Sequence, residues 1–149
     1  MDNVERAASL FEEGFNCSQS VFSAYAEQFG LPSETALRIA APFGGGMGRM
    51  GEVCGAVVGA FMAIGLKHGN TKAEDRGKKE ESYRLAREFS SLFQERNGSV
   101  ICRDLLGCDI NTPEGLQYAR KEGLFNTRCL KFVRDAAEIV EKVLSEQQR

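Results

Sequence analysis

Histidine is almost absent from this chain of 149 residues, whose single imidazole belongs to His68. A Ser-His-Asp triad needs a histidine as its general base, and many zinc sites bind the metal through two or three histidines. One histidine all but excludes both kinds of site. His68 precedes Gly69 at the expected end of a helix, where an imidazolium would complement the helix dipole.

Cysteine pairs of the C-x-x-C type are also missing, although the chain contains five cysteines. Their absence excludes a thioredoxin-type dithiol and the usual zinc-finger knuckle, and without C-x-x-C-H there is no c-type haem attachment. Because five is odd, complete internal pairing is excluded too. In a reducing cytosol such cysteines are reactive thiols, metal ligands or small buried apolar residues.

A basic stripe and a long apolar run are two further absences. The net charge is -2, and the basic residues are interleaved with acids, so nucleic acid is not an expected partner. No segment approaches the roughly 20 consecutive apolar residues of a membrane span. The opening residues, MDNVERAASLFEEG, are acidic and amphipathic, unlike a signal peptide. We therefore expect a cytoplasmic protein without a membrane span.

Apolar residues recur with a helical period along almost the whole chain. The segment VCGAVV has the best strand composition, but the apolar run that follows it favours a buried helix. We expect an all-α fold, a single domain (1–149) built as a bundle of about five to seven helices. Asn16 and Ser33 are expected N-caps. The expected helices cover residues 4–14, 17–30, 31–43, 52–69, 71–98, 112–123 and 127–149, with a short helical or irregular segment at 99–110.

Glycine is concentrated in GGGMGRMGEVCGAVVGA, residues 44–60. Within it, GMGRMG matches the G-x-G-x-x-G pattern of dinucleotide-binding loops, which requires a preceding strand. A helix is expected before this stretch, so we reject a nucleotide site. A second pattern spaces small residues four apart and predicts a helix face that another helix approaches closely. Its members are Gly51, Gly55, Gly59 and Ala63.

The first part of this stretch is expected to form a glycine-rich loop before the buried central helix. Positive-φ glycines would shape the loop, and the loop would bind an anion or another ligand. Cys54 would then lie in the first turn of the helix, where the helix dipole and Arg49 lower a thiol pKa. The expected loop residues are Gly44, Gly45, Gly46, Gly48 and Arg49.

Three cysteines, Cys17, Cys54 and Cys129, are expected to start or nearly start helices, so their thiols could converge on one pocket. Cys17 and Cys129 also lie on the apolar stripes of their helices. The alternative is therefore that they are small buried apolar residues without a chemical role. Cys102 and Cys108 flank RDLLG, too far apart for a short metal knuckle.

Four segments, FNCSQSV, FGGGMGRMGEVCGAVVGA, ICRDLLG and TRCLKFV, resemble in this order the redox-active family named for its C_GCAxxG_C_C signature. The resemblance runs from about Gly14 to Val143, with CGAVVG as the CGAxxG core. It implies a small helical protein and leaves Cys108 as an extra, dispensable cysteine. The chain is also similar to the non-haem part of split-Soret cytochromes, which suggests an iron–sulfur cluster. The implied signature cysteines are Cys17, Cys54, Cys102 and Cys129.

Three functions remain open on this basis. In the first, a thiol-based redox protein or oxidoreductase uses Cys54 as the nucleophile, and another signature cysteine resolves it as a disulfide. In the second, the four thiolates bind an iron–sulfur cluster or zinc. In the third, the chain is a non-catalytic module whose glycine loop binds a small anion or a protein. The redox partner, protein or small molecule, and a homo-oligomeric state are left open.

Overall fold

The computed structural model describes residues 1–146, and most of them belong to helices. The all-α fold is confirmed, since the β-type pairing within these residues is one isolated bridge between Val53 and Ile101. Two 3₁₀ turns, η1 (Glu27–Phe29) and η2 (Ala41–Phe43), follow α2 and α3. The helices are α1 (Asn3–Glu13), α2 (Cys17–Ala26), α3 (Ser33–Ala40), α4 (Gly44–Met47), α5 (Gly55–His68), α6 (Arg76–Asn97), α7 (Cys102–Leu106), α8 (Pro113–Lys121) and α9 (Leu124–Leu144).

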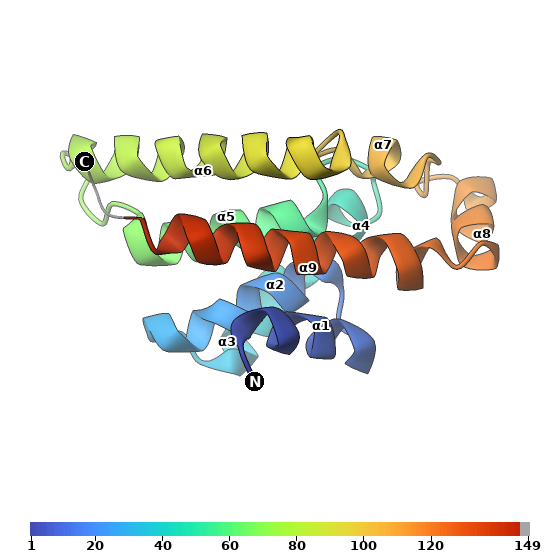
Figure 1. Cartoon of the computed structure of the whole chain (residues 1–149), viewed down its shortest axis with the longest axis horizontal. Coiled ribbons are helices and arrows are strands. Elements are labelled where there is room, and N and C mark those ends of the chain that lie inside the picture. Colours follow the sequence, from blue (N-terminus) through green and yellow to red (C-terminus); the bar gives the residue numbers. More distant parts are fainter. Residues whose placement is uncertain (147–149) are drawn as a thin grey trace.

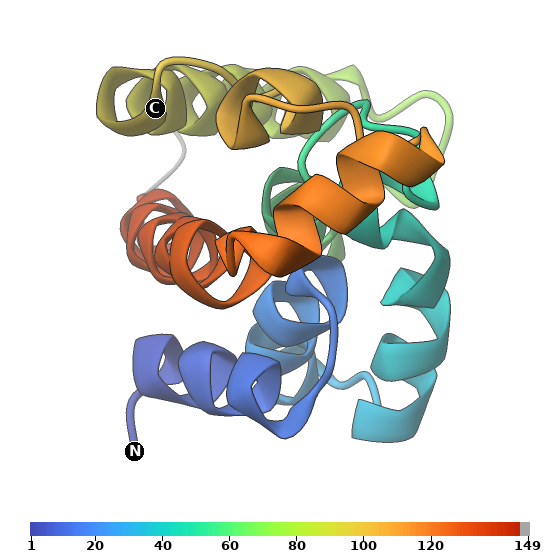
Figure 2. The ribbon, with the colours of Figure 1, turned by 90° about the vertical axis from the view of Figure 1, so that its right-hand side faces the viewer.

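The helices are stacked in three layers (Figure 1). α6 forms one outer layer, α5 and α9 lie in the middle, and α1, α2 and α3 form the opposite side. α9 contacts α1, α2, α5 and α6, while α2 and α5 pack closely against each other. Figure 2 looks at the end of the bundle where α7 and α8 lie, close to the starts of α2, α5 and α9. Several helix N-termini therefore meet at one end.

Side-chain caps determine where several helices begin. Asn16 caps α2 as expected: its Oδ1 accepts from the Gln19 N–H at 2.9 Å, and Gln19 Oε1 accepts from the Asn16 N–H at 3.0 Å. Asp2, Asp75 and Thr112 cap α1, α6 and α8 in a similar way. The reciprocal bonds at Asn16 make Cys17 the first residue of α2, with its side chain in the first turn.

Other expected boundaries are wrong by a few residues. Pro32 is the N-cap of α3, so Ser33 is already helical and makes no side-chain cap. α6 begins at Arg76 rather than at residue 71, because Asp75 supplies its cap. α9 begins at Leu124, three residues before its expected start. It ends at Leu144, with Ser145 as its C-cap, and so is shorter than the expected helix to residue 149. Residues 147–149, which include the end of the expected domain, lie outside the described residues.

The central helix α5 begins at Gly55, not at residue 52 as expected. Its preceding segment is extended, because the Cys54 N–H donates to Val100 O at 2.8 Å and the Cys102 N–H donates to Glu52 O at 2.6 Å. These two bonds flank the bridge at Val53 and tie the entrance of α5 to the entrance of α7. Backbone pairing with a distant segment thus overrides the helical pattern here.

The expected small-residue face of α5 is confirmed at Gly55 and Gly59. A Cβ on Gly59 would lie 2.8 Å from Ser18 O, and one on Gly55 would lie 2.5 Å from Cys17 Sγ. Both contacts come from α2, so the missing side chains let the two helices approach closely. Gly51 does not belong to this face, because it precedes the helix and has a φ of 72°.

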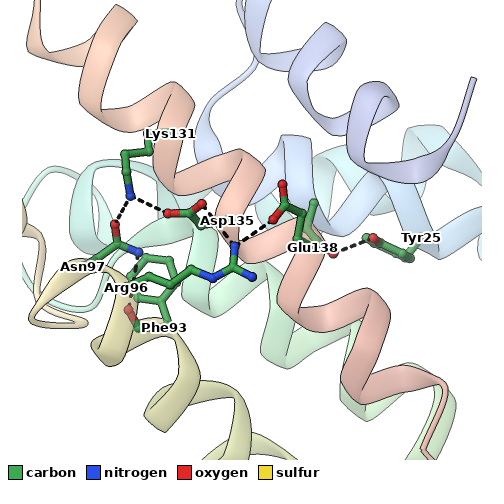
Figure 3. Close-up of polar contacts among 8 residues, drawn as sticks. Tyr25, Phe93, Arg96, Asn97, Lys131, Asp135 and Glu138 are labelled. Atoms are coloured by element: carbon green, nitrogen blue, oxygen red, sulfur yellow. Dashed lines mark hydrogen bonds and ion pairs between the residues drawn. The ribbon is translucent and has the colours of Figure 1, made fainter.

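α9 is held by a buried polar bond and by ion pairs at its surface (Figure 3). The buried Tyr25 hydroxyl donates to Ala137 O at 2.8 Å, joining α2 to α9. On the opposite side, Arg96 Nη1 of α6 lies 2.8 Å from Glu138 Oε2 and 3.3 Å from Asp135 Oδ1. Among residues 1–146, no helix combines the length and apolar character needed to cross a membrane.

His68 ends α5, as expected, but its surroundings disfavour the expected imidazolium form. Burial, followed by the charge of Lys67, lowers the pKa of the imidazole below its ordinary value. A lowered pKa weakens the expected interaction of an imidazolium with the negative end of the helix dipole. The ammonium group of the neighbouring Lys67 donates to Leu144 O, at the end of α9.

Candidate functional site

A cavity of about 550 Å³ opens at the end of the bundle seen in Figure 2. The start of α2, the α4 segment, the start of α5, α7, α8 and the first half of α9 all contribute to its wall. All four cysteines of the expected signature line it, whereas Cys108 is not part of its wall in the described chain. The expected convergence of thiols on one pocket is therefore observed. The four are Cys17, Cys54, Cys102 and Cys129.

Cys17 is the thiol whose charged form the fold favours. A hydrogen bond from the Cys54 thiol is the main reason that the pKa of Cys17 falls to about 7, although burial opposes this shift. The backbone N–H groups of Gly45, Ser18 and Cys17 itself also donate to the sulfur. Hydrogen bonds to the thiolate stabilise it, and the position at the start of α2 acts in the same direction.

Cys54 has the opposite character. It is the N-cap of α5 and not a first-turn residue, and its side chain makes no capping bond. The hydrogen bond to Cys17, followed by burial, raises the pKa of Cys54 above its ordinary value. These directions are opposite to the expectation for Cys54, and which of the two thiols reacts stays a prediction.

Cys102 and Cys129 are neutral thiols held on other parts of the cavity wall. Burial, helped by the nearby sulfur of Cys17, raises the pKa of Cys102 to about 12 and also raises that of Cys129. Cys102 begins α7, whereas Cys129 lies in the second turn of α9. The expectation that Cys129 nearly starts a helix is wrong, since Gly123 is the N-cap of α9.

The glycine-rich segment forms a left-handed turn beside this cavity. Five consecutive residues, 45–49, have φ between 61° and 69°, including the non-glycine residues Met47 and Arg49. The turn is closed by the Arg49 N–H donating to Gly44 O at 3.1 Å and the Glu52 N–H donating to Gly46 O at 2.9 Å. L-residues with side chains adopt this conformation at a cost of roughly 1–2 kcal/mol each. Binding of a ligand by this turn stays a prediction.

Close contacts explain why the turn needs glycine where it faces the cavity. A Cβ on Gly46 would lie 2.6 Å from Cys102 Cβ and 2.7 Å from the Glu52 nitrogen. Gly44 lies against the Asn16 side chain, where an added Cβ would meet Nδ2 at 2.5 Å. The turn is thus packed between the start of α2 and the start of α7. This packing brings the Gly45 N–H to the sulfur of Cys17.

A single metal ion does not fit the arrangement. Within the described part of the chain, no three side chains of histidine, cysteine, aspartate or glutamate are gathered closely enough to bind one. The expected zinc site therefore has no geometric support. Four cysteines around one cavity nevertheless match the donor set of an iron–sulfur cluster, whose iron atoms are distributed over a larger volume.

Several parts of the site were not expected from the sequence. Arg120 of α8 lines the cavity, as do Asn126 and a set of aromatic side chains. Nothing in the local pattern marks Arg120, because its position depends on α8 crossing the end of the bundle (Figure 2). The four phenylalanines of the wall lie within expected helices or in the short segments between them, so no pattern distinguished them from core residues. They are Phe11, Phe15, Phe125 and Phe132.

A comparison with family models assigns the chain. The model of the family described as "Putative redox-active protein (C_GCAxxG_C_C)" matches residues 15–143. The chain belongs to this family. Membership confirms the resemblance seen in the four cysteine segments, and in this chain the central hexapeptide reads CGAVVG, with Cys54 before Gly55. No curated protein and no solved structure matches the chain.

The family assignment and the geometry agree on where the chemistry lies. The family description states redox activity, and its signature names four cysteines. In this member of the C_GCAxxG_C_C family, those cysteines line a single cavity, and two of them share a hydrogen bond. A buried thiolate with a thiol beside it can attack a disulfide or be oxidised to one.

Proposed function

We propose that this protein is a thiol–disulfide redox protein in which Cys17 is the nucleophile and Cys54 is the resolving thiol. The observation that carries the proposal is the place of both cysteines at the wall of one open cavity, where the sulfur of Cys17 lies against Gly55, the residue that follows Cys54. Adjacent sulfurs need little movement to form a disulfide. The proposal exchanges the roles expected from the sequence, because the pKa of Cys17 is lowered and that of Cys54 is raised.

The reaction follows ordinary thiol–disulfide exchange. The Cys17 thiolate attacks one sulfur of a disulfide in the cavity, a mixed disulfide forms, and the other substrate sulfur leaves as a thiolate. Cys54 loses its proton to that leaving sulfur and attacks Cys17, which releases the second substrate sulfur as a thiolate. The substrate gains two electrons from the protein, one proton from Cys54 and one proton from water, and the protein is left with a Cys17–Cys54 disulfide. A thiol reductant returns the protein to its dithiol form by the reverse steps.

Burial restricts this chemistry to molecules that enter the cavity. Cys17 is 9% exposed and Cys54 is 5% exposed, so a large protein surface cannot reach the sulfurs directly. The cavity volume of about 550 Å³ is within the range of small-molecule sites. A small disulfide, or an extended segment of a partner protein, is therefore the expected substrate.

The test is a redox titration of the purified chain with mass spectrometry. We expect a reversible loss of two hydrogens located in a Cys17–Cys54 disulfide, with substitution of either residue by serine abolishing it. Cys108→Ser is the matched control and should leave the titration unchanged, because Cys108 lies outside the cavity wall. A reversible disulfide that persists in the Cys17→Ser variant would contradict the proposal.

An iron–sulfur cluster is the second candidate, and it is favoured by the arrangement of all four signature thiols around one cavity. Cys17, Cys54, Cys102 and Cys129 would hold it, and a bound cluster would supply one-electron transfer. Anaerobic purification followed by iron analysis and visible absorption separates the two candidates. Stoichiometric iron that is lost in Cys102→Ser and in Cys129→Ser supports the cluster, whereas iron-free protein with the reversible disulfide supports thiol exchange.

The place of the protein in the cell follows from the same chemistry. A thiol that must return to its reduced form after each cycle belongs in a compartment rich in thiol reductants. We therefore keep the cytoplasm as the proposed location, with a redox partner that is either a small thiol or a protein. If Cys17→Ser and Cys54→Ser both leave cellular activity unchanged, the chain acts instead as a non-catalytic binding module.

A further inference from the structure

The cavity wall carries positive charge from two arginines. Arg49 lies in the left-handed turn and Arg120 lies in α8, and they are the charged residues among the lining residues of the described chain. Neither arginine forms an ion pair with a carboxylate of residues 1–146, although most other arginines near the surface do. Two unpaired guanidinium groups beside one cavity form an arrangement suited to an anionic group.

The fold places Arg49 close to the reactive sulfur. A Cβ on Gly45 would lie 2.8 Å from Arg49 Cγ, so the stem of this arginine runs over Gly45. The N–H of the same Gly45 donates to the sulfur of Cys17. Arg49 is held there at a φ of 66°, a conformation that arginine seldom adopts without other support. The backbone strain is thus located at the residue that brings a positive charge to the cavity.

The rest of the wall is mainly apolar. Phe15 precedes α2, Phe125 and Phe132 come from α9, and Leu105 and Ile110 add aliphatic surface. Such a wall binds an apolar molecular body by removing its surface from water, while a few polar groups orient it. The cavity therefore combines an apolar body site, an anion site and a pair of sulfurs.

We propose that the cavity binds a small organic disulfide, or the corresponding thiol, whose apolar body ends in a carboxylate. Arg49 and Arg120 bind the carboxylate, the phenylalanines contact the body, and the sulfur end faces Cys17. This inference rests on the proposed function for the fate of the sulfur atoms, but carboxylate binding does not require the thiols to react.

The test uses lipoate and lipoamide, which share an apolar chain and a ring disulfide and differ in the carboxylate. Binding is measured by calorimetry on the Cys17→Ser, Cys54→Ser double variant, so that no exchange takes place. We expect lipoate to bind at least about tenfold more tightly than lipoamide, which corresponds to about 1.4 kcal/mol. Arg49→Gln and Arg120→Gln should each remove most of that preference.

Arg87→Gln provides the matched control, because Arg87 is an exposed residue of α6 that does not line the cavity. It removes the same charge and should leave the preference for lipoate intact. Equal binding of lipoate and lipoamide would overturn the inference, as would a preference lost equally in Arg87→Gln. Circular dichroism of each variant confirms that a lost preference comes from the arginine and not from unfolding.

A second measurement covers the active protein and separates the two proposals. With all cysteines present, the rate of reaction with 5,5′-dithiobis(2-nitrobenzoate), which carries carboxylates, is compared with that of the neutral 4,4′-dithiodipyridine. We expect the ratio of the two rates to fall about tenfold in Arg49→Gln and Arg120→Gln. If both reagents react fast and the ratio of their rates is unchanged in the arginine variants, the carboxylate inference is overturned and the thiol-exchange proposal stands. Carboxylate-dependent binding without any exchange supports the inference and overturns the thiol-exchange proposal.

Discussion

At the scale of single residues, the site depends on an asymmetry between two cysteines that look alike in the sequence. Cys17 and Cys54 both precede or begin a helix, so the argument from helix N-termini applies to each. The fold separates them, because backbone N–H groups from α2 and from the left-handed turn converge on Cys17. The contact with Cys17, followed by burial, instead raises the pKa of Cys54 above its ordinary value.

This asymmetry predicts how reactivity changes with pH. Alkylation of Cys17 by iodoacetamide should accelerate as pH rises through about 7 and then level off, since only the thiolate reacts. Cys54→Ala removes the donor, and the midpoint should then move up toward the ordinary value of 9.0. Mass spectrometry of the peptide that contains Cys17 measures the rate at each pH.

Cys108→Ala is the control for this prediction, because burial raises the pKa of the Cys108 thiol and its side chain lies outside the cavity wall. It should leave the Cys17 midpoint unchanged. Faster alkylation of Cys54 than of Cys17 at neutral pH would show that the two roles are reversed.

The sequence predicted which cysteines gather at one cavity but not the order of their acidities. The motif around CGAVVG identified the four cysteines, and the structure places all four at one cavity. The order of their acidities depends on hydrogen bonds from residues distant in the chain, such as the Gly45 N–H on Cys17. Arg120 was missed for the same reason, since tertiary packing of α8 brings it to the site.

At the scale of elements, the left-handed turn determines the shape of the cavity wall. Gly46 and Gly48 both have positive φ, but they differ in their surroundings. Gly48→Ala meets only Pro42 O at 3.7 Å and should cost about 1 kcal/mol from backbone strain. Gly46→Ala adds a clash with Cys102 and the Glu52 backbone, and we expect an additional loss of about 1–3 kcal/mol. Urea unfolding of both variants measures the difference, and equal losses would contradict the assigned packing.

The contact between α2 and α5 gives a second matched pair of glycine variants. Gly55→Ala places a Cβ against Cys17 Sγ and Phe43 O, and we expect a loss of about 1–3 kcal/mol together with slower alkylation of Cys17. Gly65 lies on the same helix with nothing within 4 Å of an added Cβ. Gly65→Ala should therefore stabilise the chain by up to about 1 kcal/mol.

Thermal and urea unfolding measure both variants, and the alkylation rate reports on the site. If the two substitutions shift stability in the same direction, close packing of α2 on α5 is not what requires glycine at position 55.

Elements were predictable where the pattern was local and uncertain where it was not. The cap of α2 at Asn16 follows from neighbouring residues, and the structure confirms it. The start of α5 was predicted three residues too early. Residues 52–54 are held extended by backbone hydrogen bonds with Val100 and Cys102, which lie about fifty positions further along the chain. For residues 45–49, the sequence predicted positive φ at the glycines. It did not predict the positive φ of Met47 and Arg49.

At the scale of the whole molecule, α9 joins the outer layers to each other. Tyr25→Phe removes the buried bond between α2 and α9, and we expect a loss of about 1 kcal/mol. Asp135→Asn at the ion pairs of Figure 3 should cost about 1 kcal/mol or less, since its partners Arg96 and Lys131 are exposed to solvent and such pairs are weak.

Added salt distinguishes the two substitutions, because screening reduces surface pairs and leaves a buried neutral hydrogen bond unchanged. Urea unfolding at low and high salt provides the comparison. If the stability lost in Tyr25→Phe is recovered at high salt, the layers are joined by surface charges and not by the buried hydrogen bond.

The overall class of the fold could be predicted because the helical period extends along the chain, and no strand pattern competes with it. The arrangement of the helices in layers could not be predicted, since it depends on which apolar helix faces pack against each other. α9 shows one continuous apolar stripe in the sequence, yet it contacts α1, α2, α5 and α6 together. The cavity at one end of the bundle is a product of that layering.

The position of α9 also bears on how the protein is made. A ribosome synthesises the chain from residue 1 onward, so Cys17 and Cys54 emerge long before Cys129 and the helix that carries it. Until α9 has left the exit tunnel, α1, α5 and α6 lack one of the helices on which they pack, and the cavity lacks part of its wall. The nascent chain therefore exposes its first two thiols to cellular oxidants before the fold can shield them. Synthesis in a reducing compartment protects the pair during that interval.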